Sequence, residues 1–306
     1  MHQYLCYGLC FHSEIALPEL SVCPNGQIAD VVIRRGILNL SEEDRAHDNI
    51  IDFAPDGSVK YFWPEVGGFN VAPDGSEVLV EAAPGATDDL LAFPLLGPIL
   101  SEVLRARGYF VLHAGAVTIS GQAVGFMADK GVGKSTTTTM LVSSGARHLT
   151  DDLFAIHVDT MLAPPGFGQV KLVAEACSFA PEGATIRPEV HKKIDKTRVK
   201  LADFDPNGRF PVSWLFVLER GAGREFAIQP LSAEEALVAI MRFSFPIRFG
   251  EEGAAHGRGA VDFLRAAAIS RNINVARLEV SNDIADLAYL QSKISTFLNE
   301  YACEEK

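Results

Sequence analysis

Apolar residues in the first part of the chain come in short runs that turn-forming residues interrupt. Four of these runs are rich in branched and aromatic side chains, a composition typical of β-strands: 31–40, 58–66, 68–75 and 76–83. Pro-Asp-Gly occurs at 55–57 and again at 73–75, which indicates tight turns between strands. We therefore predict a strand-rich, antiparallel N-terminal module that comprises residues 1–88.

The pattern then changes to a longer apolar run with helix-capping signals. Thr87 precedes two aspartates, which suit the positive N-terminal end of a helix, and the run ends at Gly108. This run is interrupted by Pro94 and Pro98, so we do not expect it to span a membrane. We predict a helix here that marks the junction with a second domain, residues 89–306.

Beyond this helix, strand and helix patterns alternate. Residues 109–120 and 122–128 are apolar enough for buried strands, Lys134–Ser144 has the length of a helix, and 146–159 contains two more strand-like segments. The order strand, loop, helix, strand is that of an α/β nucleotide-binding core. Near the end of the chain, apolar residues recur at helical spacing and predict a helix packed on that core: Ile284, Leu287, Leu290, Ile294, Phe297 and Leu298.

The overall charge narrows the possible partners. The chain has 39 acidic and 27 basic residues, a formal charge of -12, which argues against a general nucleic-acid or membrane surface. The N-terminus has no basic leader followed by a long apolar run, and the odd number of cysteines, five, suits a reducing compartment. We therefore expect a cytoplasmic protein. Cys6 and Cys10 could form a metal site with His12, but buried strand positions are favoured for both.

The first signal of chemistry lies at residues 128–135, which read Ala-Asp-Lys-Gly-Val-Gly-Lys-Ser. This differs from the phosphate-loop pattern G-x-x-x-x-G-K-[ST] only at the first glycine, and Ala128 matters there only if the position needs a positive φ. Such a loop points successive N–H groups at a phosphate, at the positive end of the following helix. The predicted nucleotide-binding residues are Asp129, Lys130, Gly131, Val132, Gly133, Lys134, Ser135 and Thr136.

A pair of acids follows the predicted helix. Asp151 and Asp152 end a short apolar strand, where many phosphate-loop proteins place an acid that holds Mg²⁺. If the strand continued through both residues, their side chains would point to opposite faces, and one could serve the metal while the other accepts a proton. In this interpretation Lys134 bridges the terminal phosphates of ATP and the Ser135 hydroxyl completes the shell of a bound Mg²⁺, while the residues alone do not decide which of the two acids serves the metal.

Residues 112–156, from "LHAGAV" through "GVGKSTTTT" to "LTDDLFAI", resemble the C-terminal catalytic domain of HPr kinase/phosphorylase. The resemblance implies a phosphate-loop core similar to phosphoenolpyruvate carboxykinase, and a kinase that uses ATP and magnesium to phosphorylate a serine on a protein partner. It implies that Asp151 is the general base, that Asp152 assists at the metal, and that His113 lies near the phosphates. A buried, hydrogen-bonded role for His113 is an equal alternative.

A second resemblance covers most of the chain. "YGLCFHSEIALPEL" at 7–20, the helix before "YFVLHAGAV" and the pair Lys171 and Leu172 are similar to HPr-kinase-like proteins of ribosomal-peptide clusters, including lasso peptide kinases. This implies that the partner is a small protein or a precursor peptide carrying the acceptor serine. The sequence does not decide the oligomeric state, and a homo-oligomer is left open. The segment 166–183 lacks the Glu-x-Arg-Gly signature of the reverse reaction, so phosphorylase activity is not expected.

Three interpretations of the function follow. The first is a serine kinase, in which Lys134, Asp151 and His113 are catalytic. The second is a regulatory module that binds a nucleotide without transferring phosphate, and the third is a kinase for a small metabolite. Spacing does not decide which further cation contacts the transferred phosphate; the candidates are Lys171, Arg242, Arg248 and Arg258. Residues 242–259 suit either a substrate lid or a surface loop.

Overall fold

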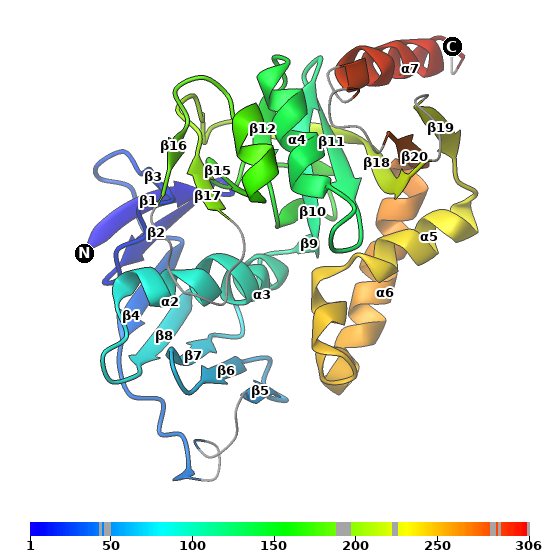
Figure 1. Cartoon of the computed structure of the whole chain (residues 1–306). Coiled ribbons are helices and arrows are strands. Elements are labelled where there is room, and N and C mark those ends of the chain that lie inside the picture. The colour runs from blue at the N-terminus through cyan, green and yellow to red at the C-terminus, as the bar shows by residue number, and fades with distance from the viewer. Residues whose placement is uncertain are drawn as a thin grey trace.

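The structure, a computed structural model, is mixed α/β and contains several sheets (Figure 1). It describes residues 1–42, 45, 50–187, 197–221, 226–281, 286 and 289–304. The helical segment 88–106 runs between the strands of the N-terminal sheet and those of the second sheet (Figure 1). The expected α/β class is confirmed, and no helix among these residues is long and apolar enough to cross a membrane.

The N-terminal strands form one eight-stranded sheet in the order β3-β1-β2-β4-β8-β7-β6-β5. Most neighbours are antiparallel, but β4 runs parallel to both β2 and β8, so the prediction of a purely antiparallel module was wrong. The segments 14–30 and 36–76 separate the parallel partners in the chain, and such long connections leave no local signal of strand direction. The strands are β1 His2–Cys6, β2 Leu9–Ser13, β3 Ser21–Val22, β4 Val31–Arg35, β5 Ile50–Phe53, β6 Val59–Trp63, β7 Gly67–Val71 and β8 Glu77–Ala82.

The predicted junction helix is present but kinked. Thr87 caps it by accepting a hydrogen bond from the Leu90 N–H, as the sequence indicated. The chain passes through α2 (Asp88–Pro94), η1 (Leu95–Ile99) and α3 (Leu100–Ala106), with non-helical backbone at Gly97. The two prolines explain the break, since each lacks the N–H that a continuous helix needs.

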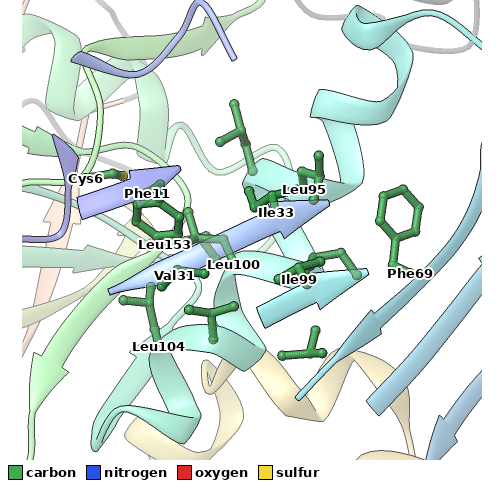
Figure 2. Packing of buried hydrophobic residues seen from close by; sticks show 14 of the residues in the cluster. Cys6, Phe11, Val31, Ile33, Phe69, Leu95, Ile99, Leu100, Leu104 and Leu153 are labelled. Atoms are coloured by element: carbon green, nitrogen blue, oxygen red, sulfur yellow. The ribbon is translucent and has the colours of Figure 1, made fainter. Parts of the chain in front are cut away.

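This kinked helix covers the N-terminal sheet. Leu95, Ile99 and Leu104 pack with strand residues such as Val31 and Phe69 in one hydrophobic cluster (Figure 2). The same cluster contains Leu153 from beyond residue 88, so the N-terminal module packs directly on part of the predicted second domain. The division of the chain at residue 88 stays a prediction.

The second sheet carries the predicted nucleotide-binding elements. Its order is β12-β10-β11-β18-β20-β19, with β14 paired to β18. The strands β11, β18 and β20 are parallel neighbours, so their carboxyl ends meet at one edge. Its strands are β10 Ala114–Ile119, β11 Gln122–Met127, β12 Arg147–Thr150, β14 Leu162–Ala163, β18 Phe210–Arg220, β19 Ala227–Pro230 and β20 Asn274–Val280.

Smaller sheets and helices complete the fold. One pair joins β9 (Tyr109–Leu112) to β13 (Phe154–His157), and β15 (Gln169–Leu172), β17 (Thr197–Lys200) and β16 (Thr185–Ile186) form a three-stranded sheet. The remaining helices are α4 Lys134–Ser143, η2 Ala174–Phe179, α5 Ala233–Arg242, η3 Phe245–Phe249, η4 Glu252–Gly257, α6 Arg258–Asn272 and α7 Leu290–Glu304.

The predicted order of strands and helix in residues 109–159 is confirmed, but the expected single strand 109–120 is two strands, β9 and β10, which belong to different sheets. The C-terminal helix is confirmed from Leu290 onward, and its Leu290 and Ile294 are buried against the second sheet. The predicted positions Ile284 and Leu287 lie outside the described residues. Cys6 and Cys10 are buried on β1 and β2 and carry free thiols, as favoured; among the described residues no three metal-ligand side chains form a cluster.

We expect His148 to make the fold sensitive to acid. His148 is buried on β12, and burial lowers the pKa of its imidazole from the ordinary 6.5 to about 4. Below about pH 6.5 the imidazole is therefore protonated in the unfolded chain, whereas in the folded chain it stays neutral down to about pH 4. The free energy of unfolding falls as the pH drops through this window. The full loss is about 3 kcal/mol, of which roughly 2 kcal/mol falls between pH 7.5 and pH 5.

Urea unfolding of wild type and His148→Leu at these two pH values checks this expectation. The difference between the two proteins isolates His148, because all carboxylates are common to both. A variant of the exposed His2, His2→Leu, should retain the wild-type dependence. Equal acid sensitivity in His148→Leu and wild type would contradict the assignment.

Candidate functional site

A cavity of about 490 Å³ lies at the N-terminal end of α4, a size typical of small-molecule sites. The phosphate-loop sequence forms one wall, and residues from six other segments complete it. These contributions come from the kinked helix, His113, the turn after β12, β15, the end of β18 and η3. The lining includes Phe93, Leu96, Gly97, Pro98, His113, Ala128, Asp129, Lys130, Gly131, Gly133, Lys134, Ser135, Thr136, Asp152, Leu153, Lys171, Val173, Arg220, Phe245 and Arg248.

The glycines of the loop are required by its backbone. Gly131 has φ +89° and Gly133 has φ +109°, a region that side-chain-bearing residues rarely adopt. Ala128 is not among the residues with positive φ, so the missing first glycine costs no backbone strain. Helix α4 begins at Lys134 without a side-chain cap, and the N–H groups of its first turn have no partner within the helix. This end of α4 is a site suited to an anion.

Replacing Gly133 with alanine should weaken nucleotide binding at least tenfold. The new Cβ would lie 2.6 Å from a guanidinium nitrogen of Arg220, and the left-handed backbone would cost about 1–2 kcal/mol. Gly145 at the other end of α4 is a matched control, since its φ is +104° and nothing lies within 4 Å of an added Cβ. Calorimetric titration with ATP should show weakened binding in Gly133→Ala alone, while both variants lose stability. Equal ATP affinity in the two variants would contradict a role for the loop.

The acidic pair lies in a bend beside this loop. Strand β12 ends at Thr150, so the strand does not continue through the two acids and the condition for alternating faces is not met. The two carboxylates nevertheless differ in surroundings. The Asp151 residue is 4% exposed and does not line the cavity, whereas the Asp152 side chain is 25% exposed and does.

Asp151 faces the start of α4. Its Oδ2 accepts a hydrogen bond of 2.9 Å from the Lys171 backbone N–H. Burial, and then the charge of Asp152, raise the pKa of the Asp151 carboxyl to about 6, and the nearby Ser135 hydroxyl opposes this shift. Asp151 Oδ1 and Ser135 Oγ are both buried and lie near each other, but neither makes a hydrogen bond of ordinary geometry with a described residue.

These two unsatisfied oxygens suit a hard cation. Buried polar atoms without partners are rare, and Mg²⁺ prefers a few protein oxygens together with waters and phosphate oxygens. Such a site needs fewer protein ligands than a closed metal cluster. Ser135 and Asp151 therefore fit a magnesium ion that accompanies a nucleotide on α4.

Asp152 is surrounded by nitrogen atoms. Its Oδ2 lies 2.7 Å from Lys171 Nζ, and its Oδ1 lies 3.7 Å from His113 Nε2 and 4.0 Å from Lys134 Nζ. Burial alone would raise the pKa of this carboxyl, but the Lys171 charge and the other neighbours outweigh burial and hold it well below its usual range. Asp152 is therefore ionised at neutral pH.

The pKa values of two basic neighbours of Asp152, His113 and Lys171, shift in opposite directions. Burial lowers the pKa of His113 more than Asp152 raises it, so His113 tends to be neutral beside the cavity. For Lys171, burial also lowers the pKa, but the charge of Asp152 reverses this and the net pKa is raised. Lys171 is therefore a permanent cation, and its ammonium also lies over the Phe93 ring at 5.3 Å.

Of the four candidate cations, two line the cavity and two do not. Lys171 and Arg248 line the cavity. Arg242 pairs with Asp129 at 2.6 Å, with both side chains largely exposed. Arg258 is buried in an ion pair with Glu102, away from the phosphate loop. Residues 245–258 form short helical turns rather than an extended loop, and Phe245 and Arg248 of η3 bring them to the cavity.

The structure brings most of the predicted site residues together, but two do not line the cavity. Besides Asp151, Val132 is absent from the lining and packs on the hydrophobic cluster under α4. Two parts of the cavity were not predicted from the sequence: Arg220, and the wall formed by Phe93 and Leu96. Arg220 ends β18, the parallel neighbour of β11, so a strand assignment for 210–220 would have placed it at this edge.

Comparisons with known proteins do not show a family for this chain. No protein-family model matches the chain, and no curated protein matches it. Among solved structures, the HPr(Ser) kinase/phosphatase from Coxiella burnetii aligns with a TM-score of 0.32 and 10% sequence identity, over 63% of this chain and 96% of that chain. A likeness this distant says nothing about the chemistry of the site.

Proposed function

We propose that the protein is an ATP- and magnesium-dependent phosphotransferase that phosphorylates a serine hydroxyl on a small protein or precursor peptide. One observation carries the proposal: the phosphate loop and an ionised carboxylate, Asp152, face the same cavity. A protein that only holds a nucleotide needs the loop, but it does not need a desolvated carboxylate beside the terminal phosphate. The serine and the peptide are inferred from the resemblance to HPr kinase and to lasso peptide kinases.

The family resemblance implies that Asp151 is the general base and that Asp152 assists at the metal. The geometry favours an exchange of these two roles. Asp151 is shielded from the cavity and lies beside Ser135, so it would hold the magnesium together with that hydroxyl. Asp152 faces the cavity, so it would accept the hydrogen bond of the acceptor hydroxyl and take its proton as the new P–O bond forms and the bond from the transferred phosphorus to ADP breaks. The magnesium ion, when bound, would neutralise phosphate charge.

The remaining residues would supply positive charge. Lys134 is 8% exposed, and its ammonium would meet the transferred phosphoryl group in a site largely shielded from water. Lys171 and Arg248 also line the cavity, so they would neutralise the same group. Neutral His113 can donate one hydrogen bond to a phosphate oxygen without changing the charge of the site.

The rim of the cavity suits a polypeptide acceptor. Phe93 and Val173 line the cavity and are 45% and 43% exposed, which leaves an apolar surface beside the phosphate loop. A small, highly polar metabolite would leave these side chains in water. A peptide with an apolar residue near its serine would cover them.

Mass spectrometry after incubation with magnesium ATP tests the proposal. The acceptors are HPr and a set of serine-containing precursor peptides, and each serine is also replaced by alanine as a control. We expect one phosphate on the serine of at least one acceptor. Normal ATP binding without transfer to any acceptor would favour a regulatory nucleotide-binding module, and transfer to a small hydroxylated metabolite would favour the third interpretation.

A further inference from the structure

The tight turn between β1 and β2 holds an unusual residue. Its two central residues, Tyr7 and Gly8, have φ +52° and +68°, as in the type I′ hairpin turn. Glycine and asparagine adopt such angles readily, but for a bulky residue a positive φ is an outlier. Since Tyr7 does not prefer this conformation, contacts of its side chain must hold it there.

Those contacts lie far away in the chain. Tyr7 is completely buried, and its hydroxyl donates a hydrogen bond of 2.6 Å to the Leu153 carbonyl. The same oxygen lies 3.1 Å from Thr150 Oγ1. Thr150 directly precedes the acidic pair and Leu153 directly follows it, so one hydroxyl ties together both ends of the acidic turn, residues 150–153.

A third segment is fitted around the same side chain. The Tyr7 backbone N–H donates to the Pro165 carbonyl at 2.8 Å, and the Gly166 N–H donates to the Leu149 carbonyl at 2.9 Å. A Cβ on Gly166 would lie 2.6 Å from the Tyr7 hydroxyl oxygen, so this glycine leaves the room that the hydroxyl needs. The segment then continues to Lys171, whose N–H binds Asp151.

Packing supports the same connection. Leu153 lies in the hydrophobic cluster of the N-terminal sheet, together with Phe11 and Val31 (Figure 2). Burial raises the pKa of the Tyr7 hydroxyl well above its ordinary value, so the group remains a donor at every relevant pH. Tyr7 does not line the cavity, which leaves it no direct contact with a bound nucleotide.

We propose that Tyr7 is a positioning residue, which fixes the acidic turn against the start of α4 by bridging Thr150 and Leu153. The kinetic part of this proposal rests on the proposed phosphotransferase activity. Phosphate transfer depends mainly on the position of charged groups, so a small displacement of Asp151 and Asp152 slows the reaction without abolishing ATP binding. The N-terminal sheet then supports the active site through the tip of one hairpin.

The test is Tyr7→Phe, which keeps the ring and removes only the hydroxyl. Tyr61→Phe is the matched control, because Tyr61 is also fully buried in the same hydrophobic cluster, and its hydroxyl contacts Glu102 at 3.4 Å. We expect kcat to fall about tenfold in Tyr7→Phe with the KM for ATP within about twofold of wild type. The control should retain kcat, and the melting temperatures of the two variants should be similar. Thr150→Val, which removes the other hydroxyl, should lower kcat in the same way.

Hydrogen–deuterium exchange tests the positioning without any need for an acceptor. Exchange of the amides in 146–153 and 165–172 should become faster in Tyr7→Phe and should stay at the wild-type rate in Tyr61→Phe. The increase of ATP affinity on adding Mg²⁺ should also shrink in Tyr7→Phe.

The outcomes separate this proposal from the proposed function. If wild type transfers phosphate to no acceptor, the kinase assignment fails, and the exchange and ATP titrations still decide the positioning role. Unchanged exchange in Tyr7→Phe, or a loss of kcat that Tyr61→Phe shares, would overturn the positioning role.

Discussion

Asp152→Asn is expected to lower the rate of phosphate transfer roughly 100-fold or more while ATP binding survives. The substitution keeps the size of the side chain and removes its charge, so the acceptor hydroxyl loses the group that takes its proton. Lys171 and Lys134, 2.7 and 4.0 Å from the carboxylate, each lose one anionic neighbour. The greater positive charge of the site should hold a nucleotide as tightly as before or more tightly, which distinguishes this effect from general damage to the fold.

Asp151→Asn is the matched comparison. This variant should lose the gain in ATP affinity that Mg²⁺ provides, because the amide carries no charge and, with its oxygen accepting from the Lys171 N–H, turns an NH2 group toward the proposed ion. Calorimetric titration with ATP, with and without Mg²⁺, and a transfer assay on the same preparations separate the two acids. The opposite result would be that Asp152→Asn retains phosphate transfer, while Asp151→Asn loses transfer but keeps the gain in ATP affinity from Mg²⁺. In that case the roles implied by the family resemblance stand, and the proposed exchange of roles between the two acids is wrong.

Local features of the site could be predicted because they are encoded within a few neighbouring residues. The positive φ angles of Gly131 and Gly133 follow from a pattern that only glycine satisfies, and the cap at Thr87 follows from the residues beside it. The acids after β12 could be found because a strand that enters such a site ends there. In each case the physical cause and the sequence signal occupy the same short segment.

The remaining features depend on contacts between distant segments. Tyr7 and Thr150 are 143 positions apart, and nothing in "YGLCF" indicates that the hairpin tip reaches the acidic turn. The parallel pairing of β4 with β2 and β8 is likewise set by the packing of long connections, not by the composition of the strands. Which acid faces the cavity was also beyond reach, since adjacent residues in a bend have no fixed alternation.

Lys134→Met is expected to reduce kcat/KM for ATP by a factor of about 10²–10³. Methionine retains the apolar stem that packs in the loop, and Lys134 is 8% exposed, so the loss measures the charge rather than the packing. Water cannot replace a buried ammonium aimed at the phosphates, whereas an exposed one is already screened. Lys130→Met is the natural control, because Lys130 belongs to the same loop and lines the same cavity but is exposed.

Steady-state assays of phosphate transfer on both variants check this expectation, and thermal unfolding shows whether either variant is damaged. Lys130→Met should stay within about threefold of wild type, since an exposed charge contributes little. Equal losses in the two variants would mean that the loop acts only through its overall positive charge. A loss confined to Lys134→Met would instead support a contact between this ammonium and the transferred group, because only a desolvated charge has so large an effect on the reaction.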